Sequence, residues 1–254
     1  MFAKDYGICI RAIDYSDTSQ IVTFFTRENG SLGAIAKGSK RAKSAFGGPI
    51  EVLTGGAIAF SSSENSGLAT LTEFEQKPLC PAVISRPSAF YCCLFAMELL
   101  NSFIDEHDPH PHLFDSFSDF LENVNDSVTK GASNRTIIIL LILFQLSLLK
   151  QTGIQPVIDR CTNCRKELSE TQKAYFSSSA NGLLCMDCEG SFPEKVRISA
   201  KTVQTLSNLR RLREADPRLT AGIEKLLIYH FREKMHKMPK MAKYILQGLK
   251  FNQE

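Results

Sequence analysis

The stretch CTNCRKELSETQKAYFSSSANGLLCMDC, residues 161–188, contains two C-x-x-C pairs with twenty residues between them. A C-x-x-C pair folds into a tight knuckle that points two sulfurs at one ion, and the return segment brings the second knuckle opposite the first. Two pairs at this separation are typical of a four-thiolate zinc site. The sequence therefore predicts one zinc ion held by Cys161, Cys164, Cys185 and Cys188.

The segment between the knuckles predicts a small β-hairpin. Residues 174–177 and 183–184 are strand-like, and residues 180–182 (Ala-Asn-Gly) are typical of a turn. Four thiolates leave no open coordination position, so the ion would brace the fold rather than activate water. Arg165 and Glu189 stand where such knuckles often carry glycine. Four reduced thiols or two disulfides are the alternative interpretation of the same cysteines.

The composition is that of an ordinary globular protein. The 254 residues are 43% hydrophobic and 22% charged, which supplies a core and allows two or three small domains. The first residues do not resemble a signal peptide, and the longest apolar stretch, 137–149, is too short to span a bilayer. We therefore expect a cytoplasmic protein with a buried core helix. The remaining cysteines are expected to be inert buried thiols: Cys9, Cys80, Cys92 and Cys93.

Residues 1–78 alternate apolar and polar side chains in the manner of β-strands. The strand-like segments are one containing Ile8, Ile10 and Ala12 at period two, then 20–27, 32–36, 50–60 and 68–74. The sequence Glu28-Asn29-Gly30-Ser31 predicts a hairpin turn after the second segment. Five short strands in this length favour a five-stranded β-barrel of the OB type, with a β-sandwich fragment as the alternative.

The loop after the third strand, residues 37–48, carries four basic side chains within seven residues and no acidic one, with glycines near both ends. Ammonium and guanidinium groups on a flexible loop beside a barrel make an electrostatic track for phosphates. We therefore expect Lys37, Lys40, Arg41 and Lys43 to bind nucleic acid. Phe46 either stacks on a base or, as we favour, tucks into the end of the barrel. A solvated surface connection is the alternative interpretation of the whole loop.

From residue 87 onward the apolar period becomes helical. Three helices are expected before the cysteine stretch, and Val203, Leu206, Leu209 and Leu212 predict the seam of one helix after it. Residues 195–250 carry 14 basic and 4 acidic side chains, which favours a polyanionic partner. Some of these basic side chains lie near helix C-termini, where they complement the helix dipole.

These segments together predict an α+β multidomain protein. The expected parts are an OB-type nucleic-acid-binding domain at residues 1–78, a bundle-like helical domain formed by 79–158 and 195–254, and an inserted four-cysteine zinc-finger unit at 159–194.

The run DYSDTSQIVTFFTRENGSLGAIAKGSKRAKSAFGG, residues 14–48, resembles the opening segment of RecO, a bacterial family of recombination mediators. Two further segments resemble the same family: FQLSLL at 144–149 with Gly153, Pro156 and Asp159-Arg160-Cys161, and, less specifically, Tyr229-His230 with residues 234–237. The order and spacing of these matches cover nearly the whole chain.

The resemblance implies an OB-fold, a helical domain and a zinc-finger unit that many members carry. It implies a non-enzymatic role in DNA repair at the bacterial nucleoid: binding single- and double-stranded DNA, annealing complementary strands and helping load recombinase onto strands coated by single-strand-binding protein. The implied partners are the protein RecR and the acidic tail of single-strand-binding protein, with no membrane and no small-molecule substrate. By position, Lys37, Lys40, Arg41 and Lys43 match the family's DNA-contacting loop, and Arg11 and Arg27 are further candidates.

The chain departs from the family pattern at two places. Ile142 and Leu143 stand where members often carry a basic residue before the phenylalanine that here is Phe144, so Arg135 or Lys150 would have to serve an acidic-tail pocket. Residues 237–238 are Lys-Met where a Lys-Ser pair is typical.

Other function classes lack their motifs in this sequence. A zinc deaminase would need H-x-E with P-C-x-x-C, and no H-x-E occurs. A dithiol redox protein would need one C-x-x-C near a βαβ pattern, which is absent. A nucleotide-binding protein would need a P-loop or a dinucleotide-binding glycine motif, and neither is present. The remaining alternative is a zinc-ribbon adaptor that acts mainly by docking other proteins.

Overall fold

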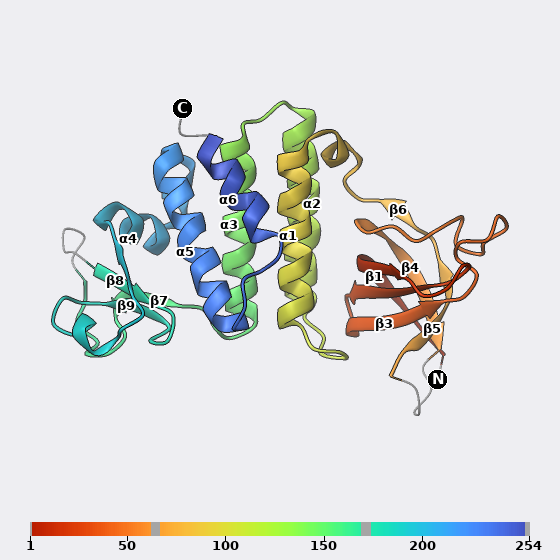
Figure 1. Ribbon diagram of the computed structural model, residues 1–254, viewed down its shortest axis with the longest axis horizontal. Helices are drawn as coiled ribbons and strands as arrows, with labels where there is room; N and C mark the ends of the chain where they lie inside the picture. The colour runs from red at the N-terminus through yellow and green to blue at the C-terminus, as the bar shows by residue number, and fades with distance from the viewer. Residues whose placement is uncertain (1, 62–66, 169–173, 252–254) are drawn as a thin grey trace. The chain divides into compact units, whose positions relative to one another are not determined.

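The structure is a computed structural model that describes residues 2–61, 67–168 and 174–251 (Figure 1). The chain divides into two compact units, Met1–Lys130 and Gly131–Glu254. The first unit contains the six strands β1–β6 and two α-helices, and the second contains a four-stranded sheet and four α-helices. The finer domain boundaries expected from the sequence stay a prediction.

The first unit is built on a closed β-barrel. Its strands are β1 (Phe2–Asp14), β2 (Gln20–Thr26), β3 (Gly30–Ala36), β4 (Thr54–Ser61), β5 (Ala69–Phe74) and the short β6 (Lys77–Pro78). They pair in the order β1-β2-β3-β5-β4-β6, β3 and β5 run parallel, and β4 pairs back onto β1. This confirms the predicted five-stranded barrel. The fourth strand begins at Thr54 rather than residue 50, because Leu53 takes a left-handed φ of 64°.

A β-bulge interrupts β1 at Ile10. Cys9 pairs with Phe24 and Arg11 pairs with Thr23, so one extra residue lies between two consecutive pairs. Cys9 and Ala12 therefore both face the barrel core, although they are three positions apart. The expectation that Ile8, Ile10 and Ala12 share one face is wrong, because period two does not continue through a bulge.

The barrel core also fixes both ends of the basic loop. The Gln20 side chain donates to the Ile50 carbonyl at 3.2 Å and accepts from the Ile50 N–H at 2.8 Å. The Ser39 hydroxyl donates to the same Gln20 amide oxygen at 2.9 Å, and all three groups are buried. The loop thus leaves and re-enters the barrel at positions held by one side chain.

Two helices follow the barrel in the same unit: α1 (Pro87–Phe103) after a 3₁₀ turn at Pro81–Ser85, and α2 (Pro111–Thr129). Each begins with proline, which is pre-organised for the first helical position. Phe25 of β2 packs against Phe114 and Phe117 of α2, with ring centroids 5.5 and 6.3 Å away. The helices therefore cover part of the barrel's outer face.

The second unit contains α3 (Asn134–Gln151), α4 (Ala200–Ser207), a 3₁₀ segment (Leu209–Arg213), α5 (Pro217–Met235) and α6 (Ala242–Phe251). Ser133 caps α3 by accepting from the Thr136 N–H at 3.3 Å. The single helix expected through residues 203–212 is instead broken at Asn208, whose side chain accepts from the Arg210 N–H and starts the 3₁₀ segment.

Helices α3 and α5 lie side by side (Figure 1). Among the helices of the described ranges, α3 alone is long and apolar enough to cross a membrane by length and composition, a test that buried core helices also pass. Half of its 18-residue window is buried. The helix is longer than the apolar stretch 137–149 that the sequence suggested, because polar residues at both ends join it.

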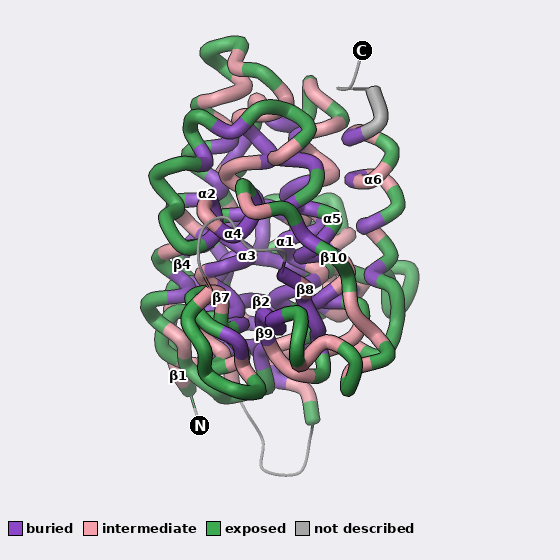
Figure 2. The backbone as a smooth tube through the Cα atoms, turned by 90° about the vertical axis from the view of Figure 1, so that its left-hand side faces the viewer, coloured by how far each residue is buried: buried purple, intermediate pink, exposed green. Residues whose placement is uncertain are grey.

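A small sheet completes the second unit, with strands β7 (Val157–Cys161), β8 (Ala174–Ser177), β9 (Gly182–Leu184) and β10 (Val196–Ile198) in the order β10-β8-β9-β7. Strands β8 and β9 form the predicted hairpin and are mostly buried (Figure 2). The hairpin brings the second C-x-x-C pair back to the first.

Candidate metal centre and nucleic-acid surface

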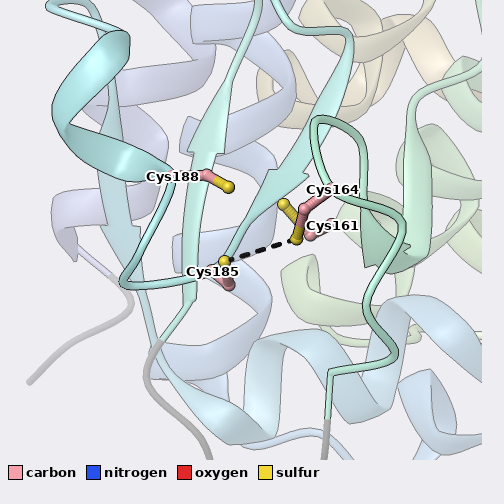
Figure 3. Close-up of side chains that lie close together, drawn as sticks. All are labelled: Cys161, Cys164, Cys185 and Cys188. Carbon is pink, nitrogen blue, oxygen red and sulfur yellow. Dashed lines mark hydrogen bonds between the residues drawn. The ribbon is translucent and has the colours of Figure 1, made fainter.

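The four cysteines of the two knuckles converge on one point (Figure 3). Their sulfurs all lie within 4.8 Å of one another, and the Sγ atoms of Cys164 and Cys185 are 3.8 Å apart. None of the eight cysteines forms a disulfide, so the disulfide interpretation does not describe this structure. Within the described ranges this is the one group of three or more potential ligands found, and it could hold a metal ion.

The backbone of each knuckle is held by its own hydrogen bonds. The Arg165 N–H donates to the Cys161 carbonyl at 2.8 Å, and the Cys188 and Glu189 N–H groups donate to the Cys185 carbonyl at 3.2 and 3.1 Å. Arg165 has a φ of 64°, the left-handed conformation that explains why glycine is common at this position. The knuckle therefore forms without glycine.

The environment of the sulfurs separates the pKa values of two cysteines. Burial opposes ionisation of Cys161, but hydrogen bonds from the backbone at Cys164, Cys185 and Asn163 outweigh it and lower its pKa to about 6. At Cys188 the Asn163 amide, which lies 3.3 Å from the sulfur, favours the thiolate. Burial and the three neighbouring sulfurs nevertheless raise the pKa of Cys188 to about 12. A bound cation would favour the thiolate form of these sulfurs.

The cysteine unit buries some side chains around the sulfurs and others against helix α5. The cluster around the sulfurs consists of Cys161, Leu184 and Cys185, with a few partly buried side chains packed around them. The unit is joined to helix α5 by Ser178, whose hydroxyl lies 2.9 Å from Nδ1 of His230, and by the ring of Phe176, 5.3 Å from the same imidazole. Burial lowers the pKa of His230 to about 4, so the imidazole is neutral at pH 7.

Glu194 makes a second junction with α5. Its carboxylate accepts hydrogen bonds from the hydroxyls of Ser177 (2.8 Å), Ser179 and Tyr229 (2.6 Å). Burial of Glu194 opposes its ionisation, but these hydroxyls outweigh that effect and lower its pKa. The hairpin, the segment before β10 and helix α5 are therefore linked through one charged group.

The predicted nucleic-acid residues differ in how far they are engaged within the protein. Lys37, Arg41, Lys43 and Arg11 are exposed, and none has an ion pair within the described part of the chain. Lys40 is 2.7 Å from Asp14, and Arg27 is 3.0 Å from Asp115 of α2. The loop thus presents three unpaired cations, while Arg27 is partly neutralised.

The aromatic residues near the loop also differ from one another. Phe46 is 4% exposed and belongs to the barrel core, as favoured from the sequence, so it is not available to stack on a base. Tyr15, which the sequence reasoning passed over, is 63% exposed in the turn between β1 and β2. Its place in a polar Ser-Asp-rich turn is the signal that could have identified it.

The second unit carries a basic cleft of about 500 Å³ between β10, α4 and α5. Four exposed cations line it, Arg197, Lys201, Arg218 and Lys225, with Asp216 as the acidic residue among them. The Asp216 side chain caps α5 by accepting from the Leu219 N–H at 2.8 Å. Arg135, a possible acidic-tail contact by the sequence, donates to the Arg213 carbonyl at 2.6 Å, and its role toward a tail stays a prediction.

The chain combines a closed OB-type barrel that carries an exposed basic loop with a four-cysteine centre in its second unit. Residues 1–77 match the family described as "Recombination protein O N terminal", and residues 85–241 match "Recombination protein O C terminal". The chain belongs to the RecO family of DNA repair proteins.

Similar curated proteins bear the same name. A DNA repair protein RecO from Bacillus pumilus is 27% identical over 240 residues, covering 92% of this chain and 89% of that protein. One from Halalkalibacterium halodurans is 29% identical, covering 81% and 76% of the two chains. One from Listeria monocytogenes serotype 4b is 30% identical, covering 73% and 68%. These relatives confirm the family that the sequence motifs suggested.

Proposed function

We propose that this protein is a non-enzymatic recombination mediator of the bacterial cytoplasm, acting at the nucleoid. In this proposal it binds single- and double-stranded DNA, anneals complementary strands and helps load recombinase onto strands coated by single-strand-binding protein. The observation that carries the proposal is the loop of residues 37–43, which holds Lys37, Arg41 and Lys43 exposed and unpaired at the barrel rim within the described structure.

The mechanism we propose is electrostatic. Cations that neutralise phosphates release condensed counterions, and two strands whose charge is partly neutralised repel each other less. A barrel that anchors both ends of its loop through Gln20 holds these cations near one place. If about four phosphates are contacted, the affinity for single strands falls with salt at a log–log slope of about −3.

Replacing Lys37, Arg41 and Lys43 together with alanine is expected to flatten this slope by about 2 and to weaken binding to all sequences alike, because three phosphate contacts are lost. Filter binding of a short single strand across a salt series measures the slope. Lys40 is left in place because its ion pair with Asp14 helps to hold the loop.

A matched control removes the same charge elsewhere in the unit, with Lys4, Lys77 and Lys130, all exposed, changed to alanine. This control should keep a slope close to that of the parent. An equal slope in the loop variant and the parent would exclude the loop as the DNA track. It would favour the alternative of a zinc-ribbon adaptor that acts mainly by docking proteins.

We further propose that the metal is one structural zinc ion. Four sulfurs at zinc–sulfur bond lengths of about 2.3 Å stand about 3.8 Å apart in a tetrahedron. The Sγ separation of Cys164 and Cys185, 3.8 Å, fits this arrangement. Zinc bound by four thiolates would stabilise the fold without an open position for a substrate.

The partners we propose are RecR and the acidic tail of single-strand-binding protein. The basic cleft of the second unit supports the second of these. Its rim is cationic, and its floor contains apolar side chains such as Ile198 and Leu226, which suits an acidic peptide with an apolar anchor.

Changing Arg197 and Arg218 to alanine is expected to weaken binding of a fluorescent acidic tail peptide by tenfold or more, since two charges facing the peptide are lost. The matched control changes Lys237 and Lys240, exposed cations outside the cleft, and should bind as the parent does. Equal peptide affinity in the cleft variant and its control would place the tail elsewhere.

A further inference from the structure

The outer face of strands β1–β3 is divided into two halves. In one half, Ile8, Ile10 and Phe25 are buried, and α2 packs on Phe25 through Phe114 and Phe117. The bulge at Ile10 lies at the border, because it reverses which residues of β1 face outward. Past the bulge, Arg11 and Ile13 point away from the core.

The second half of this face carries a row of isoleucines. Ile13 pairs with Ile21, Ile21 pairs with Ile35, and Ile13 is 42% exposed. Arg11 and Thr23 form the neighbouring pair on the same face. Adjacent strands lie about 4.8 Å apart, so the three isoleucines form a continuous apolar strip about 10 Å long.

Tyr15 follows the end of β1 directly, two residues after Ile13. Its ring has no aromatic contact and its hydroxyl no hydrogen bond within the described residues, and its side chain is mostly exposed. Its backbone is held in a tight turn, with the Tyr15 N–H donating to the Ser19 carbonyl at 2.9 Å. A large aromatic ring is thus presented on a fixed backbone.

The basic loop lies directly against this turn. The Gly38 N–H donates to the Ser19 hydroxyl at 3.2 Å, the Lys40 N–H donates to the Thr18 carbonyl at 3.1 Å, and Lys40 Nζ is 2.7 Å from Asp14. The turn itself carries Asp14 and Asp17, which would repel phosphates. A strand crossing here would therefore place its phosphates over the loop and its bases over Tyr15.

We propose that Tyr15 and the strip of Ile13, Ile21 and Ile35 form a platform on which the bases of single-stranded DNA stack, beside the cationic loop. This rests on the proposed DNA-binding function and adds to it a selectivity for unpaired strands. Stacking on aromatic rings needs exposed base faces, which a duplex does not offer, and it tolerates any sequence. The buried Phe46 takes no part.

The chain contains no tryptophan, so Tyr15→Trp introduces a single fluorescent reporter. Its emission is expected to be quenched when oligodeoxythymidylate is added. Tyr6→Trp is the control, because Tyr6 is also half-exposed but packs edge-on to Phe114 at 6.2 Å in the covered half, and it should not be quenched. An unquenched Tyr15→Trp in complexes that do form would overturn the platform.

Tyr15→Ala supplies the affinity test. Loss of one stacked base should weaken single-strand binding about tenfold at fixed salt, with the salt slope and duplex affinity unchanged, and Tyr15→Phe should retain binding. Parental single-strand affinity in Tyr15→Ala would overturn the platform while leaving the proposed function standing. A parent protein that binds no polynucleotide would overturn the function itself. If the emission of Tyr15→Trp instead changes with protein concentration in the absence of DNA, the strip is a contact between copies of this chain and the platform is overturned.

Discussion

Chelation of the proposed zinc ion is expected to unfold residues 157–198 while the barrel of the first unit stays folded. Structural zinc sites contribute on the order of 10 kcal/mol or more of apparent binding free energy, all of which is folding free energy for the unit that depends on it. The cysteine unit is such a case, since the buried cluster around its sulfurs consists of Cys161, Cys185 and Leu184. Hydrogen exchange before and after chelation would measure the loss of protection in β7–β10.

Two cysteine variants sharpen this test. Cys185→Ser should lose the metal and the hairpin's exchange protection, whereas Cys9→Ala, in the barrel core, should keep one zinc per chain by elemental analysis. The prediction fails if the purified parent contains no zinc and its four knuckle thiols titrate freely in the folded protein. Metal binding should weaken as pH falls, because protons compete for the thiolates.

Changing Glu224 to glutamine is expected to stabilise the second unit by several kcal/mol at pH 8 and by little at pH 5. Glu224 lies in α5 with no exposed surface, and the Gln145 amide of α3 donates to its Oε1 at 2.9 Å. Burial raises the pKa of Glu224 to about 8, and the Gln145 hydrogen bond offsets only part of this. The side chain is therefore protonated in the folded protein at pH 7.

The free energy of unfolding depends on pH because the folded and unfolded states bind different numbers of protons at Glu224. Between pH 4.5 and about 8 the folded state keeps a proton that the unfolded state has released, so stability falls by about 1.4 kcal/mol per pH unit across this window. The contribution is fully present below pH 4.5 and is lost as pH rises through 8. Oε2 of Glu224 and Oε1 of Gln145 are both buried without a partner, and glutamine at 224 offers a donor without a titrating proton.

Urea unfolding at pH 5, 6.5 and 8 measures this effect, with the exposed Glu122→Gln as the matched control. The stability gain of Glu224→Gln over the parent should grow with pH, while that of the control should stay flat. A gain of equal size at pH 5 and pH 8 would contradict the assignment of a protonated Glu224.

Much of the fold could be predicted because its signals are local. Two C-x-x-C pairs with a turn between them specify a hairpin and a four-sulfur centre, and the helical period that begins at residue 87 coincides with the start of α1 at Pro87. Closure of the barrel also followed from the number of strands. These features depend on spacing and residue type rather than on distant contacts.

The features that sequence reasoning missed depend on a single residue or on tertiary contacts. The bulge at Ile10 shifts the pairing by one residue without a glycine to mark it. Asn208 ends α4 by capping a 3₁₀ turn, within a leucine pattern that continues the helical period. The pairing of Arg27 with Asp115 joins residues 88 positions apart, which no local pattern reveals.

Helix α5 carries both the protonated Glu224 and, less than two turns later, the His230 that holds the cysteine unit through Ser178. One face of α5 packs against α3, and its C-terminal half contacts the hairpin through His230. Loss of the hairpin would leave the buried imidazole of His230 without the Ser178 hydroxyl and without the ring of Phe176. Phe176, Ser178 and His230 thus couple the cysteine unit physically to the helical part of the same unit.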